Sequence, residues 1–258
     1  MTDTIEVKSE DGVQTLRINR PDKKNALTRD MYGALTAGLR HGESDGAVRA
    51  HVVVGLPGAF TAGNDISDFM AFASGGALGV EILTFLHTLA DLEKPLVAAV
   101  DGLAIGIGTT LLFHCDLVYA SPGSIFRTPF LDLGLVPEAA SSLLGPAIMG
   151  HQRAFELLCL GTTFTAEDAR RAGFVTRIAS PSEVEAQAML AAKGLAAKPP
   201  EALRLARRLL CGDRSAIHQR IDDEAAQFAA RLKSPEAMEA FSAFMEKRPP
   251  RFTEAADD

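Results

Sequence analysis

Short apolar strands alternate with helical stretches over residues 1–180, and this alternation restricts the fold more than any other feature of the chain. Runs of β-branched and small apolar residues predict half-buried or buried strands at 13–18, 50–55, 96–100, 117–120 and 174–178. Amphipathic stretches between them predict helices that begin near Thr28, Val80 and Gly106. Strands that alternate with helices are typical of a layered α/β domain.

The pattern changes near Ser180, and residues 183–247 carry no strand signal. Apolar residues at helical spacing predict three helices there, and prolines at 199–200 and 235 predict helix starts. We therefore predict an α/β core over residues 1–195 and a helical region over 196–258. The apolar faces of these helices are expected to cover the core or a partner subunit.

Composition excludes several classes of function. The chain has 26 Lys and Arg against 33 Asp and Glu, a formal charge of −7, and no basic cluster, which disfavours nucleic-acid binding. No apolar run approaches the ~20 residues of a membrane span, and the polar N-terminus is unlike a signal peptide. The three scattered cysteines and six histidines lack metal-ligand spacing, so we expect no metal site and a cytoplasmic location.

The segment 60–65, Phe-Thr-Ala-Gly-Asn-Asp, follows a predicted buried strand. Its small residues allow a ligand to approach the backbone closely. The alternative is an ordinary loop in which Asn64 and Asp65 serve as turn residues.

A second segment, 101–108, is glycine-rich and leads into a predicted helix. It lacks the third glycine of a dinucleotide fingerprint. Its backbone N–H groups suit a developing oxyanion, although close helix packing also explains the glycines.

A third segment, 128–142, places Glu138 after Pro137 at the start of an apolar stretch. Glu138 is a candidate general base at a pocket wall. The alternative is a glutamate in a first helical turn that complements the helix dipole. Asp132 is a rival carboxylate, better suited to a turn. Burial would raise the pKa of Glu138 and a helix N-terminus would lower it, and the sequence leaves the balance open.

Taken in order, these segments resemble the crotonase family, also called the enoyl-CoA hydratase/isomerase family. The resemblance covers nearly the whole chain. Its segments are 19–27 (NRPDKKNAL), 60–65 (FTAGND), 101–108 (DGLAIGIG), 114–117 (HCDL), 163–175 (TFTAEDARRAGFV), 234–237 (SPEA) and 244–250 (FMEKRPP).

The family resemblance implies a spiral of ββα units followed by a helical oligomerisation region, assembled as homotrimers or dimers of trimers. It implies an acyl-CoA thioester substrate, with coenzyme A as part of the substrate and no separate cofactor. It also implies an oxyanion hole of two backbone N–H groups, which fall at Ala62 and Ile107. The family usually has glycine at the second position, but a main-chain donor needs no particular side chain.

The carboxylates identify a subgroup. Family hydratases carry two glutamates, and the matching positions here are Thr110 and Phe130. Glu138 instead matches the single catalytic glutamate of the peroxisomal-type Δ3,Δ2-enoyl-CoA isomerases. The resemblance therefore implies isomerisation of 3-enoyl-CoA to trans-2-enoyl-CoA. A hydratase, a non-catalytic CoA-binding protein and, more distantly, a nicotinamide oxidoreductase are the alternatives.

The remaining substrate contacts are expected from the same matches. Lys24 and Ala26 would lie against the adenine and pantetheine portions of coenzyme A. Lys247 would contact the phosphates of a coenzyme A on a neighbouring subunit; both lysines are otherwise solvated surface residues. Further expected members of the substrate site, including its apolar walls, are Gly63, Asn64, Asp65, Ile66, Phe69, Gly106, Phe130 and Leu133.

Overall fold

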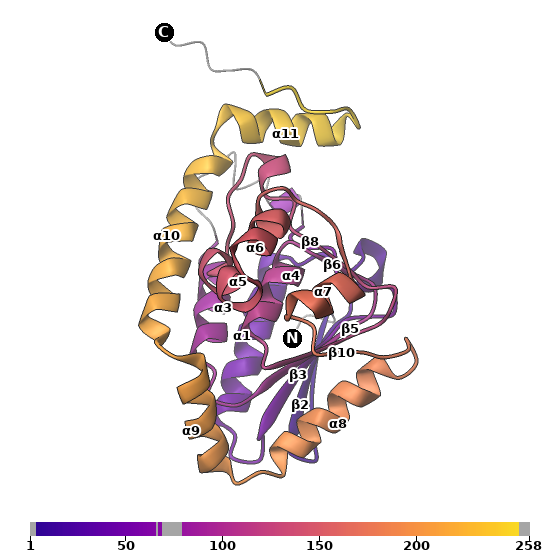
Figure 1. The fold of residues 1–258 in the computed structure, drawn as a ribbon, viewed down its shortest axis with the longest axis vertical. Coiled ribbons are helices and arrows are strands. Elements are labelled where there is room, and N and C mark those ends of the chain that lie inside the picture. Colours follow the sequence, from indigo (N-terminus) through magenta and orange to yellow (C-terminus); the bar gives the residue numbers. More distant parts are fainter. Residues whose placement is uncertain (1–3, 66, 69–78, 253–258) are drawn as a thin grey trace.

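The computed structural model describes residues 4–65, 67–68 and 79–252 (Figure 1). The strands are β1 (Ile5–Glu10), β2 (Val13–Ile18), β3 (Ala50–Val54), β4 (Ala59–Thr61), β5 (Leu96–Val100), β6 (Leu103–Ile105), β7 (Leu117–Ala120), β8 (Ile125–Arg127), β9 (Phe164–Thr165) and β10 (Arg177–Ile178). The α-helices are α1 (Arg29–Ser44), α3 (Val80–Asp91), α4 (Ile107–Thr110), α5 (Ser141–Met149), α6 (His151–Leu158), α7 (Ala166–Ala172), α8 (Val184–Ala196), α9 (Pro200–Cys211), α10 (Arg214–Leu232) and α11 (Pro235–Met245). The 3₁₀ helices of the described residues are η1 (Pro21–Lys23), η2 (Leu111–His114) and η3 (Leu131–Leu133).

The strands of the described residues form two sheets. The larger has the order β1-β2-β3-β5-β7-β10 and is parallel except for the β1–β2 hairpin; the smaller has the order β4-β6-β8-β9. Along the chain, β3, β5 and β7 each enter the larger sheet, and the next strand of each pair enters the smaller one. Helices follow these strand pairs. This is the predicted α/β spiral of ββα units.

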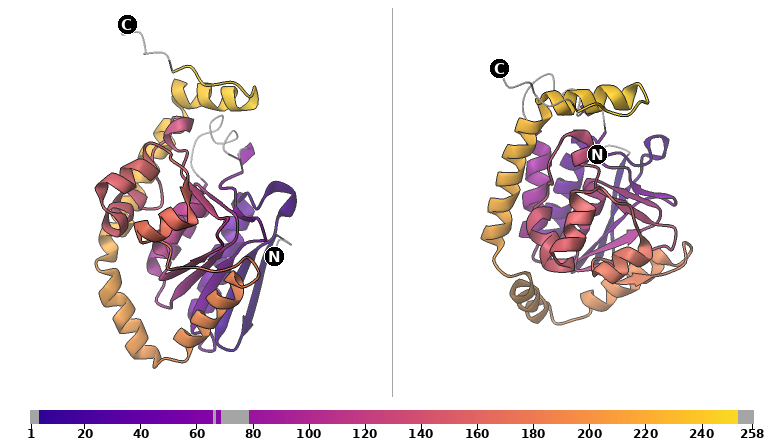
Figure 2. Two further views of the ribbon diagram at one scale, coloured as in Figure 1. Left: turned by 45° about the vertical axis from the view of Figure 1, so that its right-hand side comes forward. Right: turned by 45° about the horizontal axis from the view of Figure 1, so that its top comes forward.

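Both faces of the larger sheet are covered, which explains the apolar runs in its strands. Helices α1 and α3 cover one face, and α8 covers the opposite face (Figures 1 and 2). Alternate side chains of the strands belong to the two apolar cores beneath these helices. On β5, for example, Ala98 belongs to the apolar core on the α1 and α3 face, and Val97 belongs to the core on the α8 face. Both residues are fully buried. The sheet therefore gives a rigid base to the loops at its end.

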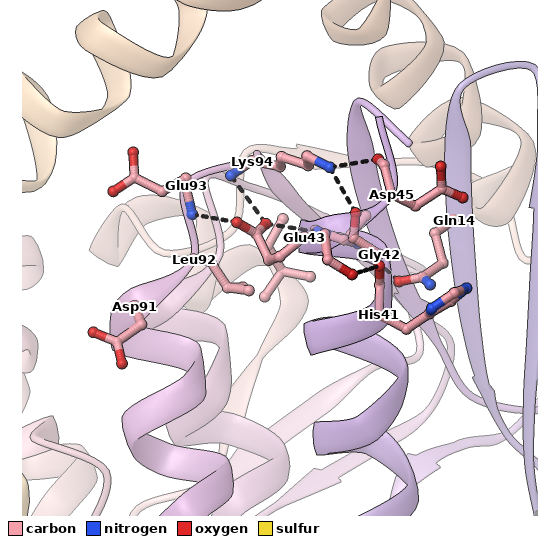
Figure 3. Close-up of polar contacts among 12 residues, drawn as sticks. Gln14, His41, Gly42, Glu43, Asp45, Asp91, Leu92, Glu93 and Lys94 are labelled. Atoms are coloured by element: carbon pink, nitrogen blue, oxygen red, sulfur yellow. Dashed lines mark hydrogen bonds and ion pairs between the residues drawn. The ribbon is translucent and has the colours of Figure 1, made fainter. Parts of the chain in front are cut away.

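A polar network fastens the end of α1 to the segment between α3 and β5 (Figure 3). The Glu43 carboxylate accepts the Glu93 N–H at 3.0 Å and the Lys94 N–H at 3.1 Å, and it lies 2.9 Å from Nε2 of the buried His51. Burial acts to raise the pKa of Glu43, but the hydrogen bond with His51 and those from the Glu93 and Lys94 N–H groups outweigh it and lower the pKa. The contact fixes α1 relative to α3.

The C-terminal helices begin where the prolines predict. Ser234 caps α11, with Pro235 in its first turn, and Pro200 opens α9. Helix α10 packs along α3, and α11 packs against η3 (Figure 1). None of the helices built from the described residues has the length and apolarity that would let it cross a membrane. The division at residue 195 remains a prediction.

Several features of the fold differ from the sequence interpretation. Helix α8 is a fourth helix in the region 183–247, where three were expected, and it packs against the larger sheet. Residues 5–10 form β1, an antiparallel edge strand that the polar composition hides because half of its side chains are exposed. The predicted strand over 174–178 pairs only at Arg177–Ile178. Phe174 instead packs edge-on against Phe113 and Phe126, with ring centroids 5.4 and 5.3 Å away, so its hydrophobicity serves the core.

Candidate active site

Glu138 lies in an unusual turn ahead of α5. Ala139 and Ala140 both adopt left-handed backbone conformations, with φ of 61° and 55°, and α5 begins only at Ser141. Such conformations are uncommon for alanine and need support from neighbouring groups. The Ser141 N–H donates to the Glu138 carbonyl at 3.1 Å, and the His114 ring Nε2 lies 2.8 Å from the Ala139 carbonyl. Glu138 therefore precedes the first helical turn, and the helix-dipole interpretation is wrong.

The Glu138 side chain is 8% exposed and accepts a hydrogen bond from the Thr110 hydroxyl. Burial is the main cause that raises its pKa to about 8; the Thr110 hydrogen bond opposes this shift, and the nearby Glu224 carboxylate adds to it. Burial thus outweighs any lowering influence, which resolves the balance that the sequence left open. A carboxyl with a pKa near neutrality can both take up and return a proton.

A small pocket lies beside Glu138, between α3 and α10. Apart from Asn64, Glu138 and Ala139, its walls are apolar side chains from these two helices: Ile82, Leu83, Leu86, Ile221, Ala225 and Phe228. A mostly apolar lining with a few polar groups is typical of ligand sites, although the free volume of this pocket, about 20 Å³, is smaller than an acyl chain requires.

The two glycine-rich turns lie directly against each other, and Asn64 of the first turn lines this pocket. A Cβ added to Gly63 would come within 2.9 Å of the Ile105 carbonyl oxygen, so only glycine allows this approach. Gly106 has a φ of 57° and leads into Ile107, the first residue of α4. The predicted donor Ile107 therefore has a backbone N–H at a helix start, for which the described residues supply no acceptor.

The assignment of Ala62 as the other oxyanion donor is wrong. Its N–H donates to the Lys24 carbonyl at 3.0 Å and is not free for a ligand. Residues 24–27 pair with this loop, and Leu27 lies opposite Asn64 in a parallel bridge. The Leu27 N–H donates to the Gly63 carbonyl, and the Asp65 N–H donates to the Leu27 carbonyl. The Asn64 N–H between them faces the other way and has no acceptor within the described part of the chain. Asn64 also lines the pocket, whereas Ala62 does not.

Sequence reasoning missed Tyr32, which holds the Asn64 side chain. Its ring is 1% exposed, and its hydroxyl donates to Asn64 Oδ1. Burial, with a contribution from the charge of Glu138, raises the pKa of Tyr32 well above its usual value, so the hydroxyl remains a donor. The ring also packs edge-on against Phe85 on α3, at 5.3 Å between centroids. Tyr32 thus fixes the loop that carries the candidate donor.

Residues 8–255 match the family model described as enoyl-CoA hydratase/isomerase. The chain belongs to the enoyl-CoA hydratase/isomerase family. It is 36% identical over 252 residues to enoyl-CoA delta isomerase 2 of Rattus norvegicus, covering 95% of this chain but only 64% of that longer protein. It is 32% identical to 1,2-epoxyphenylacetyl-CoA isomerase of Escherichia coli, over 95% of this chain and 96% of that one.

Solved structures of the enoyl-CoA hydratase/isomerase family share the fold. An enoyl-CoA hydratase/isomerase from Pseudoalteromonas atlantica superimposes with a TM-score of 0.92 at 37% sequence identity, over 97% of this chain and all of that one. The crotonase-like architecture inferred from the sequence is thereby confirmed, and members of this family act on acyl-CoA thioesters.

The residues expected near coenzyme A lie on the loop next to the family's glycine-rich turn. Asp65 pairs with Arg20 at 2.6 Å and accepts the Ser67 N–H at 3.0 Å, and Arg20 also donates to the Ala26 carbonyl at 2.9 Å. Burial acts to raise the pKa of Asp65, but the hydrogen bonds from Ser67 and Arg20 outweigh it and lower the pKa. Asp65 therefore orders the loop. Lys24 is exposed.

The other predicted residues of the family site are dispersed. Phe130 is buried in the main core, with Leu133 packed against it, and neither lines the pocket beside Glu138. Lys247 is exposed just beyond α11, in a left-handed conformation with φ of 54°. Ile66 and Phe69 lie outside the described residues. Asp132, the rival carboxylate, pairs with Arg127 at 2.8 Å on the surface.

Proposed function

We propose that this protein isomerises 3-enoyl-CoA to trans-2-enoyl-CoA with Glu138 as its sole base. The observation that carries the proposal is the buried Glu138 carboxyl, whose pKa is raised to about 8 and which is the only carboxyl among the described residues that line the apolar pocket. Thr110 and Phe130 occupy the positions where family hydratases carry glutamates. One base is sufficient for a 1,3-proton shift, whereas addition of water uses the pair.

The first step removes a proton from carbon 2 of the 3-enoyl thioester. The electron pair of that C–H bond enters the π system, and negative charge collects on the thioester oxygen as a dienolate. The N–H groups of Asn64 and Ile107 are the candidate donors to that oxygen, because both are unoccupied and their turns are in contact. A fixed oxyanion donor is worth about 10²–10³ in rate.

The second step returns the proton. Protonated Glu138 delivers it to carbon 4 while the thioester carbonyl reforms, so the double bond moves from carbons 3–4 to carbons 2–3 and the atoms balance. The carboxyl ends in its starting form. The apolar walls from α3 and α10 keep bulk water from the dienolate, which favours return of the proton over hydration.

Binding of the coenzyme A portion is assigned to the loop that holds the first turn. Lys24 and Ala26 are proposed to contact its adenine and pantetheine portions, and Lys247 of a neighbouring subunit its phosphates. The exposure of both lysines supports this role. Coenzyme A enters as part of the substrate, and no separate cofactor is proposed.

We also propose that the protein works as a homotrimer or a dimer of trimers assembled through its C-terminal helices. Large apolar side chains are exposed on α9 and α11; they are Leu205, Leu209, Leu210, Met238, Phe244 and Met245. Leu209 and Leu210 are 84% and 88% exposed, which suits an interface better than a solvated face. A stable, folded monomer in sedimentation at micromolar concentration would contradict this assembly.

The three unpaired cysteines support a reducing, cytoplasmic location.

The deciding experiment compares the purified protein on 3-hexenoyl-CoA and on crotonyl-CoA. Formation of trans-2-hexenoyl-CoA, with little hydration of crotonyl-CoA, is the expected result. Faster hydration of crotonyl-CoA would favour the alternative, an enoyl-CoA hydratase. Binding of both thioesters without turnover would favour a non-catalytic CoA-binding protein.

A further inference from the structure

Helix α5 has a capping group that comes from another helix. Its own N-cap residue, Ala140, has no side-chain hydrogen-bond acceptor, so the first N–H groups of the helix need another partner. Glu224 on α10 supplies it: its Oε1 accepts the Ser142 N–H at 2.9 Å. The Glu224 side chain is 6% exposed, so this contact is largely shielded from water.

The same carboxylate is incompletely satisfied. Glu224 Oε2 is buried and has no hydrogen-bond partner in the part of the chain that the structure describes, and the same is true of the Ser141 hydroxyl. A buried acceptor without a donor is destabilising. Burial raises the pKa of Glu224, opposed by its bonds to Ser142 and Ala140 and by the charge of Arg220. A purely structural cap would be served as well by a neutral side chain.

Glu224 and Glu138 sit at the two ends of one turn. Residues 139–141 separate Glu138 from Ser142, and the Glu224 carboxylate is one of the causes that raise the pKa of Glu138. The charged, titratable and hydroxyl groups that face the turn come from four elements: Arg220 on α10, whose Nη1 donates to the Ser142 hydroxyl at 2.9 Å, His114 on η2, Thr110 on α4 and Tyr32 on α1. Of these groups, Thr110 bonds to the Glu138 carboxylate itself, whereas Arg220 and His114 bond to the turn that follows it.

We propose that Glu224 is a positioning residue for the isomerisation: from α10 it holds the left-handed turn of Ala139 and Ala140, and so presents Glu138 to the substrate and sets its basicity. The proposal rests on the proposed function of Glu138. It assigns Glu224 no contact with the substrate. It also explains why a charged group occupies this buried position on α10.

The test separates the charge of Glu224 from its shape. Glu224→Gln keeps an oxygen that accepts the Ser142 N–H but removes the negative charge, and Glu224→Ala removes both. Asp223→Asn is the matched control, because Asp223 is the adjacent residue of α10, is exposed, and loses the same charge. The titration of the Glu138 carboxyl is followed by ¹³C NMR on glutamate-labelled protein, with the signal assigned through Glu138→Gln.

Glu224→Gln is expected to move the Glu138 titration to lower pH, with the acid limb of kcat/KM following it, while Asp223→Asn leaves both unchanged. Glu224→Ala is expected to lower kcat about tenfold or more with KM nearly unchanged, and Glu224→Gln to restore most of that kcat. An unchanged Glu138 titration in Glu224→Gln, or a wild-type kcat in Glu224→Ala, would overturn the proposal. Absence of isomerisation by the unaltered protein would overturn only the proposed function, since the NMR titration requires no turnover.

Discussion

The hydroxyl of Thr110 on α4 donates a hydrogen bond to the carboxylate of Glu138, 28 positions further along the chain. The bond joins helix α4, which follows the second glycine-rich turn, to the segment that carries the candidate base. It stabilises the ionised form of Glu138 against the desolvation that dominates its environment. The position that holds a glutamate in family hydratases thus contributes here to the tuning of a different carboxyl.

Replacing Thr110 should therefore alter the pH dependence of turnover. Thr110→Val keeps the shape of the side chain but removes the donor, so the pKa of Glu138 should rise and the acid limb of kcat/KM should move to higher pH. Thr110→Ser keeps the hydroxyl and is the control, expected to match the unaltered protein. Equal profiles for the valine and serine variants would show that the hydrogen bond does not tune the base.

Glu138→Gln should keep the fold and the affinity for CoA thioesters, because glutamine is nearly isosteric. Isomerase turnover should fall by at least ~10²-fold, the usual scale for loss of a general base. Asp132→Asn is the control, since Asp132 pairs with Arg127 on the surface and is expected to matter much less. Near-normal isomerisation by a well-folded Glu138→Gln protein would rule out Glu138 as the base.

The same substitution should stabilise the protein in alkaline solution. The folded pKa of Glu138 is raised to about 8 from an ordinary value near 4.5, so the folded state keeps a proton that the unfolded state releases between these pH values. Stability contributed by this group is therefore present below pH 4.5 and is lost as pH rises toward 8. Urea unfolding at pH 8.5 should show Glu138→Gln more stable by on the order of a few kcal/mol, with little difference at pH 4.

Tyr32→Phe tests whether the Asn64 loop must be held. The change removes only the hydroxyl that donates to Asn64 Oδ1 and leaves the edge contact with Phe85. A less constrained Asn64 N–H should lower kcat about tenfold, with a smaller change in KM, because oxyanion donors act in the transition state. Tyr119→Phe, in the core on the α8 face of the sheet, is the matched control and should keep kcat.

His114 should make the protein sensitive to acid. Burial lowers the pKa of His114 to about 4, so the neutral ring is favoured in the folded state. Stability from this group is complete above pH 6.5 and falls as pH drops toward 4, by about 2 kcal/mol at pH 5. Unfolding of His114→Gln should depend less on pH between 7 and 5 than that of the unaltered protein. An equal dependence in the two proteins would exclude His114 as the cause.

The sequence predicts elements well where periodicity and turn chemistry act locally. Thr28 caps α1 as predicted, and the buried strands at 96–100 and 117–120 lie where their β-branched and small residues indicate. Glu138 stands out by its place in the order of motifs, but its raised pKa depends on burial by α3 and α10, which no local pattern reports.

Donor assignment fails for a geometric reason. Ala62 and Asn64 are both small-loop residues next to Gly63, and only the pairing with residues 24–27 shows which N–H is already used. In an extended segment, successive N–H groups point in alternating directions, so the bond from Ala62 to Lys24 indicates which N–H groups are used and which face a ligand. Glu224 was missed because a glutamate on an amphipathic helix is normally solvated, and its burial arises from distant packing.

The pocket between α3 and α10 has a consequence for the order in which the molecule becomes active during synthesis. One wall comes from residues 82–86 and the facing wall from residues 221–228, near the other end of the chain. A nascent chain that has already built both sheets still lacks half of the apolar enclosure around Glu138. Until α10 has been synthesised, this wall is absent and the carboxyl is more exposed to water, so we expect its pKa to lie nearer its ordinary value.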